Sequence, residues 1–129
     1  MKPLSAIVVH QSEAPAQILA ESLRQHLRFV STAASYTEGY DQAKLHRAQL
    51  MILDLETIPL TQVAVLLKEL PGITIVCTHR SADDRVFDDV LAAGAADCCL
   101  ESDIRAIVHA AICHTGAGTL ADASDSAVA

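Results

Sequence analysis

Five short apolar runs alternate with five longer amphipathic stretches along most of the chain, and this alternation restricts the folds that it can adopt. The third run, Leu50–Leu53, contains no polar residue, which is typical of a strand covered on both faces of a sheet. Parallel neighbours need long crossovers, and helices between successive strands supply them. The runs that we expect to form strands are residues 6–9, 28–31, 50–53, 73–77 and 97–100.

This order of elements predicts an α/β protein, a flavodoxin-like (βα)5 three-layer sandwich whose parallel five-stranded sheet has the order 2-1-3-4-5. The helical stretches begin with a capping box, SYTE, at Ser35–Glu38, a similar SADD at Ser81–Asp84, and a proline at Pro59. Pro71 and Gly72 end the third helix. The side chains expected to face inward are Ile18, Leu19, Ser22, Leu23 and Leu27, then Tyr36, Tyr40 and Ala43, then Leu60, Val63, Ala64, Leu67 and Leu70, then Val86, Phe87, Val90 and Leu91, and last Ile104, Ile107, Val108, Ala111 and Ile112.

The end of the chain differs in composition from the rest. From Thr115 onward it reads TGAGTLADASDSAVA, small and polar residues without a hydrophobic face. Such a composition is typical of a flexible tail or linker. We therefore expect one domain over residues 1–114, followed over residues 115–129 by a flexible tail or by a linker to a further domain that the sequence does not contain.

Charge and hydropathy narrow the classes of partner. Sixteen acidic against nine basic residues give a net charge of -7, whereas nucleic acids and anionic membranes attract basic surfaces. We expect this domain to contact neither directly. The start, MKPLSAIVV, holds an apolar stretch of only four residues, too short for a signal peptide, and we expect a cytoplasmic protein.

The four cysteines, Cys77, Cys98, Cys99 and Cys113, show no CxxC spacing. We expect buried, reduced thiols rather than metal ligands or disulfide partners. Adjacent residues of a strand point to opposite faces, so Cys98 and Cys99 should lie on different sides of the sheet.

A carboxylate, Asp54, comes directly after the buried third run. Open α/β sheets place their ligand chemistry beyond the carboxyl ends of the strands, at the point where the strand order reverses. In the predicted order, His10 and Gln11 at the end of the first strand face Asp54. Thr78 and Glu101 lie nearby, at the ends of the fourth and fifth strands.

Four segments, IVVHQSE, LMILDLE, ITIVCTH and AAGAADCCLES, are spaced along residues 4–113 in a way that resembles the receiver domain of bacterial two-component response regulators. The resemblance implies that Asp54 accepts a phosphoryl group from a histidine kinase and that Thr78 is the switch hydroxyl. It implies that the backbone carbonyl of Glu56 helps to hold Mg²⁺. Such a domain is a signalling module in a phosphorelay and not an enzyme. Its expected partners are a histidine kinase or other signalling protein, a second copy bound through the face of the fourth helix, fifth strand and fifth helix, and an output domain that regulates transcription.

Several positions depart from the family's pattern and make the resemblance one to an atypical, degenerate receiver. His10 and Gln11 stand where the family has a pair of acids. Glu101, followed by Ser102, stands where the family has a lysine followed by a proline. Cys98 takes the place of the aromatic switch residue.

These departures weaken the predicted chemistry at Asp54. Mg²⁺ prefers oxygen ligands, so we expect a metal site made of Asp54, Gln11 and Glu56 to bind it weakly. Glu101 places a negative charge where the family has a positive one, and a like-charge pair ~4 Å apart costs about 4 kcal/mol at an effective dielectric constant of about 20. If protonated, His10 would bridge Asp54 and Glu101 and lock the pocket without metal.

The sequence leaves alternatives open. In one alternative, Asp54 is a working phosphoacceptor with kinase-driven switching. In another, Glu101 caps the last helix beside Ser102 and Asp103. In a third alternative, His10 is a solvated residue at the end of its strand. A transition metal held by His10, Asp54 and Glu101 is a further alternative, as is a small-molecule binder on the flavodoxin-like fold, although the chain has no GxGxxG or GxxxxGK[ST] phosphate cradle.

Overall fold

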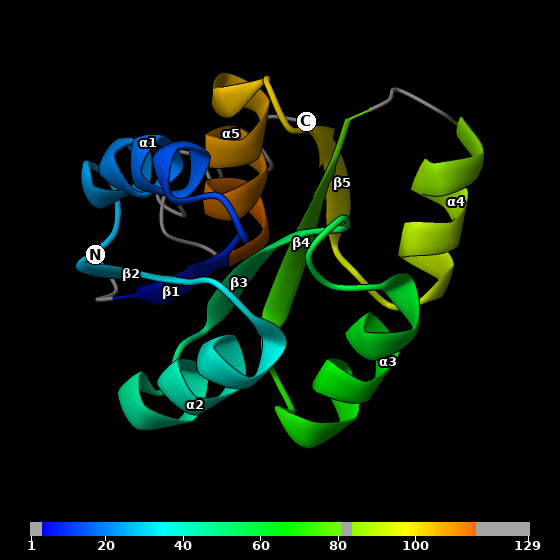
Figure 1. Ribbon diagram of the computed structural model, residues 1–129, viewed down its shortest axis with the longest axis horizontal. Helices are drawn as coiled ribbons and strands as arrows, with labels where there is room; N and C mark the ends of the chain where they lie inside the picture. Colours follow the sequence, from blue (N-terminus) through cyan, green and yellow to red (C-terminus); the bar gives the residue numbers. More distant parts are fainter. Residues whose placement is uncertain (1–3, 81–83, 116–129) are drawn as a thin grey trace, which may run out of the picture.

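The computed structural model describes residues 4–80 and 84–115, in which strands and helices alternate (Figure 1). All neighbouring strands run parallel and their order is β2-β1-β3-β4-β5, so the predicted fold class is confirmed. Within those ranges no helix is long and apolar enough to cross a membrane. The strands are β1 (Ser5–Val9), β2 (Phe29–Ala33), β3 (Leu50–Asp54), β4 (Thr74–His79) and β5 (Asp97–Leu100). The helices are α1 (Glu13–Arg24), α2 (Tyr36–His46), α3 (Leu60–Glu69), α4 (Asp84–Ala92) and α5 (Ile104–Thr115).

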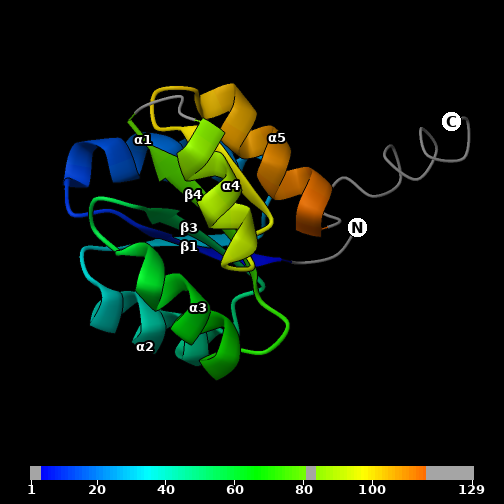
Figure 2. The same ribbon diagram turned by 90° about the vertical axis from the view of Figure 1, so that its right-hand side faces the viewer.

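The helices form two layers, with α1 and α5 on one face of the sheet and α2 and α3 on the other (Figure 2). The side chains of β3 alternate between these layers. Leu50 and Ile52 pack beneath α1 and α5, while Met51 and Leu53 pack beneath α2 and α3. All four are at most 1% exposed. The third strand is therefore covered on both faces, as its unbroken apolar sequence predicts, and its acid lies at its carboxyl end.

Helix α1 turns a different side to the sheet from the one expected. Ile18 was expected to face inward but is 59% exposed, whereas Ala16 and Ala20 are 2% and 0% exposed. The two alanines let the helix backbone lie close to the sheet, and Leu19 between them is buried. The prediction for Ile18 is wrong because it weighed large apolar side chains and left out the small ones.

Helix α4 is also less buried than expected. Phe87 and Leu91 are 40% and 39% exposed, and only Val90 of the described helix is fully buried. The reason is its position, since α4 packs mainly against β5, a short strand at the edge of the sheet. An edge strand of four residues offers too little surface to cover a whole helix face.

The end of β1 is held closely by α2. The SYTE capping box forms in one half: the Glu38 N–H donates to the Ser35 hydroxyl over 3.2 Å, whereas the Glu38 carboxylate accepts from the Ala34 N–H over 2.7 Å instead of from that of Ser35. Gly39 in the first turn allows close approach to the sheet, because a Cβ there would lie only 2.7 Å from Val9 Cγ2. This contact positions the strand directly before His10.

Two expectations fall on residues outside the described ranges. The second capping box, SADD, begins at residues 81–83, so its capping geometry stays a prediction. Helix α5 continues to Thr115, one residue past the expected domain boundary, and the predicted tail otherwise covers residues 116–129, which also lie outside those ranges.

The cysteines follow the expectation in part. All four are free thiols. Cys98 packs against the core under α2 and α3 and Cys99 against the core under α1 and α5, so their placement on opposite faces is confirmed. Cys77 is buried as expected, Cys98 and Cys99 are only half-buried, and Cys113 is exposed near the end of α5, where the expectation of burial is wrong. Burial raises the pKa of the Cys77 thiol to about 12.

Candidate functional site

The carboxyl ends of four strands bring the predicted polar residues to one edge of the sheet. Asp54 pairs in register with Thr78, because β3 and β4 are neighbours. The main chain of His10 donates to Ala33 O over 2.9 Å, and that of Glu101 donates to His79 O over 2.8 Å. The backbone around these side chains is thus fixed by sheet-type hydrogen bonds, and their meeting at this edge follows from the strand order.

Asp54 is almost completely buried, at 2% exposure. Its Oδ2 accepts a hydrogen bond from Thr57 Oγ1 over 3.0 Å, and the same hydroxyl oxygen accepts from the Gln11 N–H over 2.9 Å. Its Oδ1 is buried and has no hydrogen-bond partner among the described residues. A buried carboxylate with an unused oxygen is costly, and such groups commonly mark functional positions.

Thr57 is a site residue that the sequence interpretation missed. Its main-chain N–H and that of Ile58 both donate to the Asp54 carbonyl over 2.9 Å, so a tight turn places the hydroxyl beside the carboxylate. The available signal was a hydroxyl residue three positions after a strand-ending acid, which suits a turn.

His10 stands between the two acids. Its Nε2 lies 3.0 Å from Glu101 Oε1 and 3.8 Å from Asp54 Oδ2. Its Nδ1 accepts a hydrogen bond from the Ser12 N–H over 3.0 Å. With the Ser12 N–H at Nδ1, the Nε2 side of the ring faces Glu101 as the hydrogen-bond donor. The structure brings the three residues together as hypothesised.

We call His10, Asp54, Thr57 and Glu101 the rim cluster. Repulsion between its two acids makes the electrostatic energy of this cluster unfavourable. The ligand atoms of the two acids lie within 4.8 Å of each other. Two unit charges at that separation repel by about 3 kcal/mol at an effective dielectric constant of about 20. A single imidazole N–H serves both carboxylates, and only the contact to Glu101 is within hydrogen-bonding distance.

The donor set does not fit Mg²⁺. That ion requires near-octahedral oxygen ligands, while the rim cluster turns an N–H into the space between its carboxylates. Gln11 is exposed, and its main chain is engaged with Thr57. A transition metal on Nε2 would require the ring proton to move to Nδ1, where it would meet the Ser12 N–H.

The other predicted site residues lie outside the rim cluster. The Glu56 side chain pairs with Arg80. Cys98 packs on the α2 and α3 side of the sheet, and burial raises the pKa of its thiol, with Asp97 adding to the effect. Asp103, rather than Glu101, caps α5, because its Oδ1 accepts from the Ala106 N–H over 3.1 Å. Glu101 is therefore available to His10.

The fold is similar to that of many response regulators of known structure. A response regulator from Burkholderia pseudomallei, solved with a phosphorylated aspartic acid, a calcium ion and citrate, matches with a TM-score of 0.74 and 19% identity, over 94% of this chain and 72% of that one. An orphan response regulator of H. pylori matches with a TM-score of 0.72 and 12% identity, over 82% and 91%.

A third match is an atypical orphan response regulator with a phosphorylation-independent regulatory mechanism, at a TM-score of 0.75 and 12% identity, over 85% of this chain and 93% of that one. No family model and no curated protein matches the chain. At these identities the likeness shows the fold, which is that of a receiver domain.

Proposed function

We propose that the chain is a signalling receiver domain of a two-component system whose pocket is held by side-chain contacts rather than by Mg²⁺ and a phosphoryl group. The observation that carries this proposal is the position of the His10 N–H, 3.0 Å from Glu101 Oε1 and 3.8 Å from Asp54 Oδ2. In this proposal the His10 N–H takes the place that a positive ion such as Mg²⁺ would have between the two carboxylates.

Phosphoryl transfer to Asp54 would be slow in such a pocket. Its rate depends on positioning and on cations that neutralise the charge of the transferred group. Here Glu101 adds a negative charge at that place, and the 2% exposure of Asp54 limits access to its oxygens. The similar orphan regulator with a phosphorylation-independent mechanism is a precedent for this mode of action on the same fold.

A domain of this kind acts through protein contacts. Phe87 and Leu91 leave two large apolar side chains of α4 partly exposed. This supports a partner surface on α4, β5 and α5, for a second copy or for an output domain that regulates transcription. A histidine kinase or another signalling protein is the upstream partner in the proposal.

Intact mass spectrometry tests the proposal. The protein is incubated with Mg²⁺ and acetyl phosphate beside the Asp54→Asn variant, and no phosphoryl adduct is expected on either. The double variant His10→Asp with Glu101→Lys restores one acid of the family's pair and its lysine, and should gain one phosphoryl group, which a further Asp54→Asn change removes. A phosphoryl group on the unaltered protein that disappears in Asp54→Asn would instead show a working phosphoacceptor.

A further inference from the structure

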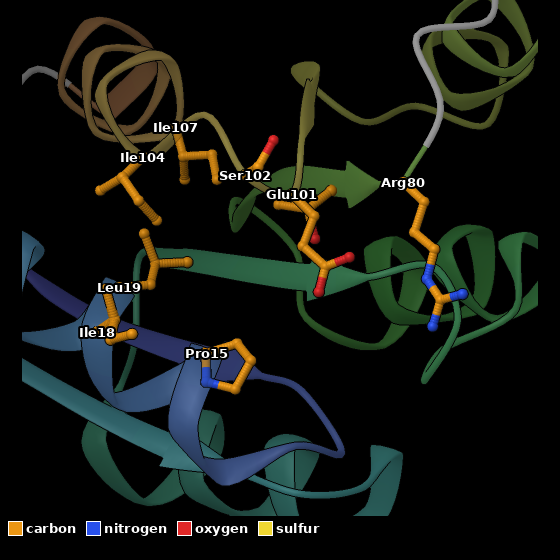
Figure 3. Close-up of a pocket in the computed structure, with 9 residues that line it drawn as sticks. Pro15, Ile18, Leu19, Arg80, Glu101, Ser102, Ile104 and Ile107 are labelled. Atoms are coloured by element: carbon orange, nitrogen blue, oxygen red, sulfur yellow. The ribbon is translucent and has the colours of Figure 1, made fainter.

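A cavity of about 590 Å³ opens between α1 and α5, beside the rim cluster (Figure 3). Its walls are apolar side chains from the two helices. Leu19 and Ile107 form a buried floor, while Ile18 stands 59% exposed at the margin. The remaining apolar lining residues are Pro15 and Ile104. A concave apolar space with a few polar groups at one end is the usual form of a small-molecule site.

The polar end of the cavity is acidic. Figure 3 shows Glu101 extending from the end of β5 toward the space between Pro15 and Arg80. Its Oε1 accepts from His10, and the side chain is 29% exposed. Asp54 lies directly behind, with ligand atoms within 4.8 Å of those of Glu101.

The cation at this end is already neutralised. Arg80 lines the cavity, but its guanidinium is paired with Glu56 on the neighbouring loop. His10 turns a single Nε2 toward two carboxylates, those of Glu101 and Asp54, and only Glu101 is within hydrogen-bonding distance of it. An anionic ligand would be repelled here, whereas a cation would relieve the repulsion between the two acids.

We propose that this cavity binds a small organic cation, a primary ammonium group carried on an alkyl or aromatic body. The ammonium group would donate to Glu101, and the body would lie against Ile18, Leu19 and Ile107. The acidic end of the cavity favours a positively charged ligand, and the exposed surface of Ile18 favours an apolar body on that ligand.

Binding would also act on the rim cluster. An ammonium on Glu101 competes with the His10 N–H for the same carboxylate, so that occupancy of the cavity loosens the contact on which the proposed function rests. The ligand is then an input signal for a pocket that phosphorylation does not control. Binding itself does not depend on the proposed function, and the two are tested by different readouts.

Methyl NMR of the full chain tests the binding, with n-octylammonium as the probe and octanoate, of equal length and opposite charge, as its counterpart. We expect saturable shifts of the Ile18, Ile104 and Ile107 methyl groups with octylammonium and none at Ile73, which lies in the core on the other side of the sheet. The preference over octanoate should be about tenfold or more, as for one hydrogen-bonded charge.

Four variants locate the site and its coupling to the rim cluster. Glu101→Gln keeps the size of the side chain and should abolish the preference for the cation. Ile18→Ser should weaken binding of the probe, while Leu45→Ser, at a residue 76% exposed on α2 in the opposite layer, should not. His10→Ala removes the competitor for Glu101 and should strengthen binding.

Absence of saturable shifts, equal binding of octanoate, or an unchanged preference in Glu101→Gln would overturn the proposed site. Unchanged affinity in His10→Ala would overturn its coupling to the rim cluster. Neither result depends on whether Asp54 takes up a phosphoryl group, so failure of this inference is distinguishable from failure of the proposed function.

Discussion

The interior of the sheet and the rim at the carboxyl ends of its strands differ in the polar groups that they contain. Inside, the four apolar residues of β3 are at most 1% exposed and carry no polar side chain. One residue further, Asp54 is also buried, yet it is an acid with a second acid close by and with an oxygen that has no hydrogen-bond partner in the described part of the chain. Packing dominates the interior, whereas the rim keeps an electrostatic arrangement that costs stability. Such a cost is typical of sites kept for function.

The largest expected effect on stability comes from a substitution in the interior of the sheet. Ile52→Ala should lower the free energy of unfolding by about 3 kcal/mol, because it leaves a cavity at a residue that is 1% exposed. Urea denaturation measures the loss. The control Leu45→Ala, at a residue 76% exposed, should change stability by less than about 0.5 kcal/mol. A comparable loss in both variants would contradict the importance of packing here.

The next largest effect on stability concerns His10, whose N–H lies between the two acids of the rim cluster. His10→Ala should cost about 2 kcal/mol, since Glu101 loses a hydrogen bond and the two acids then face each other directly. His26→Ala, which removes an exposed histidine, is the matched control. In the double variant with Glu101→Gln the added cost of removing His10 should shrink, and strict additivity in urea melts would show that the two side chains do not interact.

An alkaline titration compares a buried thiol of the interior with an exposed one. Burial raises the pKa of Cys77 from 9.0 to about 12. Between pH 9 and about pH 12 the unfolded chain binds fewer protons at Cys77 than the folded chain does. The contribution of this thiol to the free energy of unfolding is therefore complete below pH 9 and is lost as the pH rises toward 12. By about pH 10 the loss should be about 1.4 kcal/mol. Urea melts of Cys77→Ala should show a shallower decline than those of Cys113→Ala, and equal slopes would speak against this assignment.

The smallest effect has the opposite sign. Asp54→Asn removes about 3 kcal/mol of repulsion but weakens the hydrogen bond from Thr57 by about 2 kcal/mol, so we expect a net gain in stability of about 1 kcal/mol. Thermal denaturation should show a higher midpoint than for Asp41→Asn, an exposed control on α2. A lower midpoint would mean that the buried carboxylate stabilises the fold.

The fold was predictable because strands covered on both faces leave an unmistakable apolar pattern, and parallel order follows from the helices between them. The meeting of His10, Asp54, Thr78 and Glu101 follows from the same topology. The contacts within the rim cluster were not predictable in the same way. The role of Thr57 depends on one turn, and the orientation of the His10 ring depends on a single main-chain N–H. The exposure of Ile18 depends on two alanines that no count of large apolar residues includes.

The hydrogen bond from the Ser12 N–H to His10 Nδ1 joins the end of β1 to the N-cap of α1. One imidazole ring therefore links a residue at the end of β5 to the first turn of a helix on the sheet's α1 and α5 side. A shift of the Glu101 carboxylate would turn the ring and pull on that main chain. The His10 ring thus gives a side-chain connection from the rim to α1, the helix that carries Pro15 and Ile18, in addition to the hydrogen bonds of the sheet.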